Sequence, residues 1–219
     1  ALHAMDRSAG EPVETLPDAV NPYFDSDALF DLARFKRDLG GGSSAGLNAG
    51  HREQRDSYNR VGGVDTRLLW RDHYRFAGQW IGSATRDRDY RGAFTRLTPA
   101  EAAVVDSSLL DHRGEYRTGY ALHVESERET RALETGFFFD DFSPHFAADM
   151  GFISRVDQID TGAWFAPHLY SAAATWFTGI HPELFYTRTW EHGNDRYAGR
   201  LTDEVTSLET RVDLAHNGE

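Results

Sequence analysis

Residues 114–126 read GEYRTGYALHVES, and the side chains of this stretch alternate in character. Aromatic and aliphatic residues and one threonine take every second position, at Tyr116, Thr118, Tyr120, Leu122 and Val124. The charged residues fall between them, at Glu115, Arg117, His123 and Glu125. Because successive side chains of a β-strand point to opposite faces, the stretch predicts a strand with one apolar and one charged face. A soluble β-sandwich would turn the apolar face onto a core, whereas a membrane β-barrel would turn it onto lipid.

Segments with the same two-residue period recur along the chain and are separated by turn signals. We place about eleven of them, at 28–38, 44–53, 58–70, 74–86, 114–126, 132–140, 149–156, 159–167, 171–180, 183–192 and 204–215. TPAEAAVVDSSLL at 98–110 predicts one short loop helix, because Thr98 can cap it and Pro99 suits its first position. Residues 1–25 are polar and without period, which predicts a linker or disordered lead-in to a domain at 26–219.

The predicted connections are sorted by length. Counted in order, the odd connections are short, at 39–43, 71–73, 127–130, near 157–159 and 181–182. The long connections, 87–113, 141–148 and 193–203, are all even, although the even ones near 54–57 and 168–170 are brief. Outer-membrane barrels have short turns at one end and longer loops at the other. The sorting therefore favours an up-and-down barrel over a Greek-key sandwich.

Composition excludes several classes of protein. The 219 residues include no cysteine and carry a formal net charge of -12. No disulfide or thiolate metal site is therefore possible, and nucleic acid is not an expected partner. Mean hydropathy is -0.58 and no long apolar run predicts a membrane-spanning helix. ALHAMDRSAG at 1–10 offers no signal peptide, so an exported protein would be represented here by a mature or internal part.

The charged positions of these strands provide the candidate lumen-lining residues. An Arg or Lys that faces lipid at the membrane midplane costs about 2–4 kcal/mol, so charged side chains of a barrel should point to its wet interior. The candidates are Arg75, Gln79, Glu115, Arg117, His123, Glu125, Glu134, Glu209 and Arg211. In 183–192, Arg188 shares its parity with Leu184 and Tyr186. For this segment we therefore predict that Phe185, Thr187 and Thr189 face lipid.

Four stretches resemble one bacterial family. They are FDLARFKRDLGGGSSAGL at 30–47, YNRVGGVDTRLLW at 58–70, FDDFSPHFAADMGFISRVD at 139–157 and HPELFYTRTWEHGNDRYAGRLTDEVTSLETRVDLAHNGE at 181–219. Their order and spacing are similar to the outer-membrane β-barrel domain that follows a carbohydrate-binding-family-9-like module in large envelope proteins of unknown function. The resemblance covers most of 26–219 and implies a barrel with an unassigned transport or receptor role and no transferable catalytic residues. The carbohydrate-binding-like module is absent here, and 87–113 is longer than the family pattern implies.

Two acidic clusters are candidate cation sites. One contains Asp140, Asp141 and Asp149, and the other contains Glu191, His192, Asn194 and Asp195. For both, a solvated turn whose side chains cap backbone groups is the preferred interpretation. GGGSS at 40–44 lacks the lysine and helix of a phosphate-binding loop and predicts a turn. Paired carboxylates such as Glu115 and Glu125 do not by themselves indicate a hydrolase. We assign no catalytic, cofactor-binding or metal-binding residues.

The sequence thus predicts an all-β, antiparallel up-and-down (meander) transmembrane β-barrel of the bacterial outer membrane, with solute passage or a receptor role. A fragment of about 11–12 strands is expected, since single-chain bacterial barrels have an even number. HNGE at 216–219 is a turn signal with no strand after it, which also suggests an incomplete domain. Expected partners are outer-membrane lipid and lipopolysaccharide, with a small saccharide as a candidate solute and no nucleic acid.

Two alternatives stay open. A soluble β-sandwich carbohydrate-binding module would use Trp164, Trp176 and Trp190 as stacking platforms, and its apolar faces would pack against each other. An envelope hydrolase that uses acidic residues is the weakest of the three.

Overall fold

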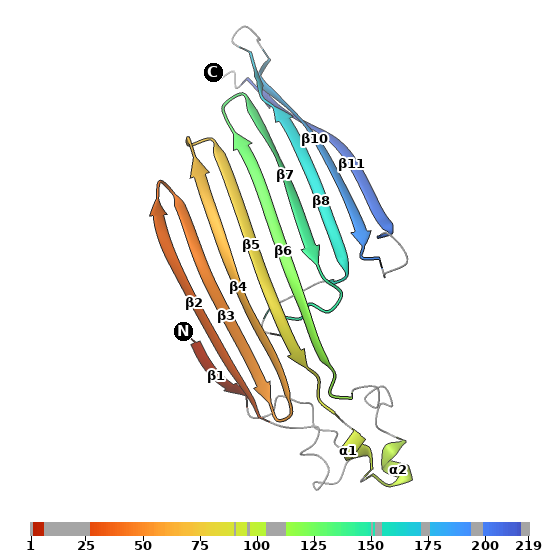
Figure 1. Cartoon of the computed structure of the whole chain (residues 1–219). Helices are drawn as coiled ribbons and strands as arrows, with labels where there is room; N and C mark the ends of the chain where they lie inside the picture. Colours follow the sequence, from red (N-terminus) through yellow and green to blue (C-terminus); the bar gives the residue numbers. More distant parts are fainter. Residues whose placement is uncertain are drawn as a thin grey trace.

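The structure, a computed structural model, describes residues 2–6, 27–89, 91–95, 97–103, 113–149, 151, 155–171, 176–193 and 199–215. This part of the chain forms one antiparallel sheet of eleven strands, in which consecutive strands lie side by side (Figure 1). Ten strands follow a single path from β1 to β11, and the short β9 pairs with β10 off that path. The predicted all-β, up-and-down antiparallel fold is confirmed. The sheet is open, because β1 and β11 are its two ends and do not pair.

The strands are β1 (Leu2–Asp6), β2 (Ala28–Gly40), β3 (Ser43–Gln54), β4 (Ser57–Trp70), β5 (Tyr74–Arg86), β6 (Tyr116–Glu129), β7 (Leu133–Phe142), β8 (Gln158–Pro167), β9 (Leu169–Tyr170), β10 (Phe177–Glu191) and β11 (Leu201–Leu214). Two single-turn helices, α1 (Arg91–Phe94) and α2 (Pro99–Ala102), lie in the β5–β6 connection. The predicted helix at 98–110 is present at its start as α2, and 104–110 lie outside the described residues. None of the described helices is long and apolar enough to cross a membrane.

The continuous register sorts the side chains onto two faces. Leu47, Val64, Trp80 and Leu122 pair in a row across β3 to β6, and we call their side of the sheet the apolar face. The next row contains Asp65, Gln79, His123 and Asp140 and defines the polar face. The alternation read from 114–126 therefore extends across the neighbouring strands of the sheet.

Most connections are sorted by length between the two ends of the strands, as the sequence predicts. The connection from β8 to β10 is an exception, because it lies at the end of the tight turns and not, as predicted for 168–170, at the end of the long connections. Residues 41–42, 71–73 and 130–132 form tight turns at one end (Figure 1). Residues 87–115, 143–157 and 192–200 connect strands at the other end, together with the brief 55–56. The predicted GGGSS turn joins β2 to β3, where Gly40, Gly41 and Gly42 have φ values of 83°, 59° and 78°. Glycine adopts these values without the steric cost that a side chain would impose.

One predicted strand and one predicted turn are wrong. No described residue of 149–156 belongs to a strand, because β7 pairs directly with β8 and leaves no ladder position for a strand between them. The predicted turn at 181–182 is instead the interior of β10. Pro182 is tolerated there because β10 pairs with β9 at Gly179 and Ile180, and with β8 only from Leu184 onward. The missing N–H of Pro182 thus falls in a gap between two ladders.

The predicted lead-in at 1–25 contains a strand. Residues Leu2–Asp6 form β1, which pairs antiparallel with Ala28–Leu32 of β2. The rest of the lead-in, residues 7–25, lies outside the described residues.

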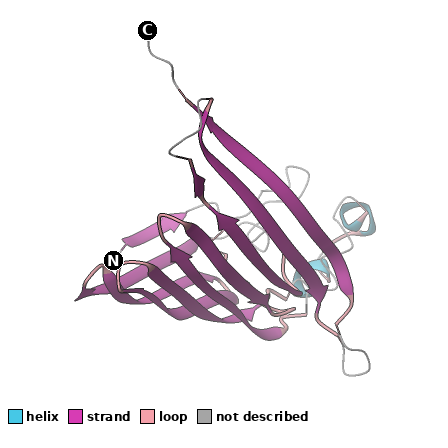
Figure 2. Ribbon diagram, turned by 90° about the horizontal axis from the view of Figure 1, so that it is seen from above, coloured by secondary structure: helices cyan, strands magenta, loops and turns pink. Residues whose placement is uncertain are grey.

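The fold has almost no hydrophobic core. Four apolar residues are buried among those described: Ala28, Ala121, Phe146 and Ala166. Large apolar side chains of the apolar face are exposed instead, for example Val64 at 49% and Trp80 at 47%. The curved sheet in Figure 2 has no second described sheet stacked on it, so the apolar faces do not pack together as the sandwich alternative requires.

Candidate functional site: the polar face and its crossing segment

The register places eight of the nine predicted lumen-lining residues on the polar face, and Glu115 lies outside the ladders. Arg75 and Gln79 come from β5, and Arg117, His123 and Glu125 come from β6. Glu134, Glu209 and Arg211 share this parity on β7 and β11. Glu115 directly precedes β6, and its carbonyl accepts a hydrogen bond from the Asp87 N–H at 3.0 Å. The set is spread across the sheet, and Glu209 and Arg211 lie at its far edge from β5 and β6.

Acidic side chains pair with arginine or histidine side chains of other strands along this face. The Arg75 guanidinium donates to Glu127 at 2.6 Å, and Arg34 donates to Asp65 at 3.0 Å. His123 Nδ1 lies 2.6 Å from Asp140 Oδ1. Such cross-strand pairs hold long side chains flat against the sheet and cancel charge locally. The polar face is thus ionic but locally close to neutral where these pairs form.

Residues 143–149 leave the end of β7 and cross the polar face; we call them the crossing segment. Ser143 starts it on β6, where its hydroxyl accepts a hydrogen bond from the Tyr120 N–H at 2.7 Å. On β5, Ser83 Oγ accepts from the Ala147 N–H at 3.2 Å. The segment ends near β3, where the Arg52 Nε lies 2.8 Å from Asp149 Oδ2.

Asn59 on β4 is the central anchor of the crossing segment. Its amide group donates to Thr85 Oγ1 at 2.8 Å and to the Ala147 carbonyl at 2.9 Å. Its side-chain oxygen accepts from the Asp149 N–H at 3.1 Å. The side chain is fully buried, at 0% exposure, so each of these bonds replaces water that cannot reach it. Asn59 therefore fixes both the position and the direction of the crossing backbone.

The crossing segment approaches the sheet closely because Gly119 has no side chain. A Cβ at Gly119 would collide with the backbone of Phe146 and His145. Phe146 is itself buried, and its ring lies 6.2 Å from the ring of Phe142. Small side chains at Ser83 and Ala121 extend the same depression on the neighbouring positions. A patch of small residues on the polar face thus receives the segment.

A cavity of about 220 Å³ lies beneath this segment. Its walls include Ile81 and Ala121 from the sheet and Phe142 and Phe146 from the end of β7 and the crossing segment. Gln79 and His123 contribute polar groups to an otherwise apolar lining. The cavity could hold a small molecule that presents one apolar side and a few hydrogen-bonding groups.

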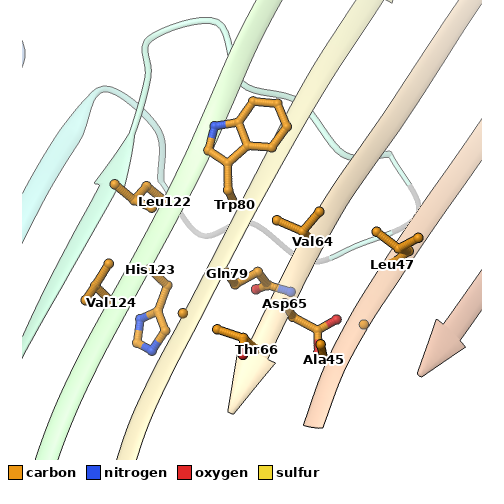
Figure 3. A pocket seen from close by; sticks show the side chains of 12 residues that line it. Ala45, Leu47, Val64, Asp65, Thr66, Gln79, Trp80, Leu122, His123 and Val124 are labelled. Atoms are coloured by element: carbon orange, nitrogen blue, oxygen red, sulfur yellow. The ribbon is translucent and has the colours of Figure 1, made fainter. Parts of the chain in front are cut away.

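The apolar face carries a shallow groove of about 450 Å³ (Figure 3). Trp80 stands between Leu122 on one side and Val64 and Leu47 on the other. Gly78 lacks a side chain at the base of the groove, between Thr66 and Val124. The hollow therefore reflects one missing side chain in an exposed apolar surface.

The predicted acidic clusters are divided by the sheet. Asp140 and Asp141 are consecutive in β7 and point to opposite faces, Asp140 to His123 and Asp141 to the Tyr120 hydroxyl at 3.0 Å. Asp149 is held by Arg52. Within the described part of the chain, no group of three or more acidic or histidine side chains is arranged to hold a metal ion.

The described residues of the second cluster are also held by separate partners. Glu191 is bonded to Arg155 and to Arg200, both at 2.9 Å, and His192 lies 2.9 Å from Asp141. Asn194 and Asp195 lie outside the described residues.

The register does not place Phe185, Thr187 and Thr189, the set predicted to face lipid, on the apolar face. Phe185 pairs with Trp164 and Thr187 with Gly162, which puts this set on the polar face. The same register separates two of the proposed stacking tryptophans, because Trp190 lies on the opposite side of β10 from the position that pairs with Trp164. Trp164 covers Gly136, where a Cβ would collide with its ring. It is therefore packed against the sheet rather than free to stack on a sugar.

Sequence reasoning missed the anchors of the crossing segment, Arg52, Asn59, Ser83 and Gly119. Asn59, Ser83 and Gly119 share one signal, a small or neutral polar residue at a polar-face position of β4, β5 or β6, which Arg52 on β3 does not share. No family model matches the chain, and comparisons with curated proteins and with solved structures gave no match.

Proposed function

We propose that the sheet is the wall of a bacterial outer-membrane β-barrel, with lipid and lipopolysaccharide against its apolar face and an aqueous passage along its polar face. The observation that carries the proposal is the inverted distribution of side chains. Four apolar residues are buried in the described part of the chain, whereas large apolar side chains are exposed along most strands. Water penalises this arrangement by about 25 cal/mol for each Å² of apolar surface, and acyl chains do not.

The backbone supports the same proposal. In a bilayer the N–H and C=O groups must be satisfied within the protein, and a continuous antiparallel ladder does so between strands. The interior pairs from β2 to β8 run through nearly every residue of each strand. Strands such as β4 (Ser57–Trp70) and β6 (Tyr116–Glu129) also exceed the 9–11 residues or so that a tilted strand needs to span a bilayer.

The crossing segment gives the passage its narrowest element. Its bonds reach β6, β5, β4 and β3 in turn, so it covers part of the polar face as a fixed feature rather than a free loop. The paired charges around it predict weak selection by charge. Small neutral solutes should pass, and the family resemblance makes saccharides and their degradation products the first to test.

The test is to refold the full chain into detergent and compare unheated and boiled samples on a semi-native gel. A folded barrel resists the detergent of the gel and migrates faster before boiling than after it. Liposomes that contain the protein should then swell in neutral sugars, with a rate that falls as the sugar becomes larger. A chain that stays dispersed as a monomer without detergent, and shows no heat-modifiable band, would overturn the proposal.

A further inference from the structure

We propose that the cavity beneath the crossing segment binds a single-ring aromatic molecule that carries one hydroxyl or N–H group, such as a phenol. This goes beyond the passage proposed above, because it assigns a retained ligand to one place on the polar face. The cavity has a volume of about 220 Å³. Pockets for drug-sized molecules have about 300–1,000 Å³, whereas an apolar cavity of about 150 Å³ takes up benzene. The volume therefore fits one ring.

The walls of the cavity favour an apolar ring. Ile81 on β5 and Ala121 on β6 pair in register and contribute the lining on the side of the sheet. Phe142 at the end of β7 and Phe146 in the crossing segment contribute two aromatic rings, with centroids 6.2 Å apart and planes tilted by 48°. Aromatic rings attract one another in tilted and offset arrangements, so a third ring between these walls gains more than its apolar area alone.

Gln79 on β5 supplies the polar contact. It pairs in register with His123, which also lines the cavity. The ring nitrogens of His123 already face carboxylates, because Nδ1 lies 2.6 Å from Asp140 and Nε2 lies 3.6 Å from Glu125. Among the described residues, the Gln79 amide has no hydrogen-bond partner. Since an amide both donates and accepts, it can bind one hydroxyl or N–H group of a ligand.

The same lining disfavours a saccharide in this cavity. A hexose carries hydroxyl groups around its whole ring, and each hydroxyl that is buried without a partner weakens binding. The backbone nearby offers few donors, because the N–H groups of Phe146, Ala147 and Asp149 already donate to oxygens of other residues. One amide cannot satisfy the hydroxyls that remain. A saccharide is therefore a candidate solute of the passage and not the ligand of this cavity.

The test titrates the refolded full chain with para-fluorophenol, followed by fluorine NMR, with detergent alone as the blank. We expect saturable binding that phenol and indole displace and glucose does not. Ala121→Leu fills the cavity from the sheet and should abolish saturable binding. Ala77→Leu is the matched control, because Ala77 lies on the polar face of β5 but outside the cavity lining. If Ala121→Leu fails to fold, Ala148→Leu fills the cavity from the crossing segment instead.

A second variant tests the polar contact. Gln79→Leu keeps a side chain of similar size but removes the amide. It should weaken phenol binding about three- to tenfold, as expected for the loss of one hydrogen bond. Toluene, measured by displacement of the probe, should bind this variant as well as it binds the native chain, because its methyl group needs no hydrogen-bond partner. An equal loss for phenol and toluene would show that Gln79 does not bind the hydroxyl group and would overturn its assignment.

The ligand should also hold the crossing segment in place, since the cavity walls come from both the sheet and the segment. At about ten times its dissociation constant, phenol should slow cleavage within 143–149 about tenfold. The proposal is overturned if the probe shows no saturable binding, if binding survives filling of the cavity, or if glucose displaces the probe. The heat-modifiable band is scored separately, and a chain that needs no detergent is titrated in buffer. Failure of this site and failure of the barrel are therefore distinguishable.

Discussion

The two faces of β4, β5 and β6 differ in what covers them. On the apolar face, Val64 and Trp80 are exposed, and no described protein segment lies against the row that they form with Leu122. On the other face of the same strands, Asn59, Ser83 and Gly119 hold the crossing segment. Hydropathy would predict that the apolar face is packed, yet no described segment covers it. The polar face is covered instead, by the crossing segment. The difference supports the proposal that lipid, not protein, is the partner of the apolar face.

The largest expected effect comes from placing a charge on the bare face. Val64→Arg should lower the free energy of unfolding by about 2–4 kcal/mol, because the cation would face acyl chains near mid-strand. Gln79→Arg is the matched control, since Gln79 pairs in register with Asp65 on the polar face and should change stability by about 0.5 kcal/mol or less. Urea unfolding in lipid vesicles, followed by tryptophan fluorescence, measures both. Equal losses would mean that the two faces share one environment.

A second contrast compares two strand glycines. Gly119→Ala forces a Cβ into the backbone of Phe146 and should displace the crossing segment, at a cost of about 1–3 kcal/mol. Gly78→Ala on the apolar face meets its nearest atom, Thr66 Cγ2, at 3.6 Å and should be tolerated. Limited proteolysis of the folded protein should cut within 143–149 in the first variant alone. Indistinguishable digestion patterns would contradict the docking of this segment.

Asn59→Ala removes two donated hydrogen bonds and one accepted one from a fully buried position. We expect a loss of about 1–3 kcal/mol and faster hydrogen exchange at the Asp149 amide. Arg52→Gln is the milder comparison, because the partly exposed pair with Asp149 should contribute less than about 1 kcal/mol. If exchange at Asp149 is unchanged in Asn59→Ala, then Asn59 is not the anchor of the crossing segment.

The smallest effect lies in a loop outside both faces. The Arg91 side chain and N–H donate to Asp89 and lower the pKa of this carboxyl from 3.8 to about 2. The lowered pKa means that the contact favours the folded loop above pH 3.8 and is lost as the pH falls toward 2. Arg91→Gln should return the pKa toward 3.8 in an NMR titration of the folded protein. An unchanged pKa would show that the pair does not form.

Alternation alone predicted much of this architecture. The segment 74–86 matches β5 residue for residue, since Tyr74 and Arg86 adjoin clear turn signals. Alternation could not assign the two faces of a strand in which charged and apolar residues share one parity. In β10, Arg188 sits on the apolar parity with Glu204 as a cross-strand partner at 3.1 Å, so a charge there does not mark the polar face. The register with β8 determines the face, and register is a property of two strands rather than one.

The candidate site was less predictable for the same reason. Its charged residues follow from parity, but the crossing segment depends on contacts between Asn59 and residues 88 and 90 positions away. A loop of that composition carries no period, and its destination is set by a depression that several strands create together. The sequence could predict that 143–149 form a loop at the end of the long connections. It could not predict that this loop returns over the polar face.

Those distant bonds have a consequence for how the chain folds. The hairpins from β2 to β6 can form through local contacts, and these bring Asn59 to Thr85. Asn59 lacks its bonds to Ala147 and Asp149 until β7 has formed and the loop after it has arrived. Closing so long a loop is entropically slow, so docking of 143–149 should be a late kinetic phase that follows strand pairing. Until that phase ends, the part of the polar face that 143–149 covers would stay uncovered.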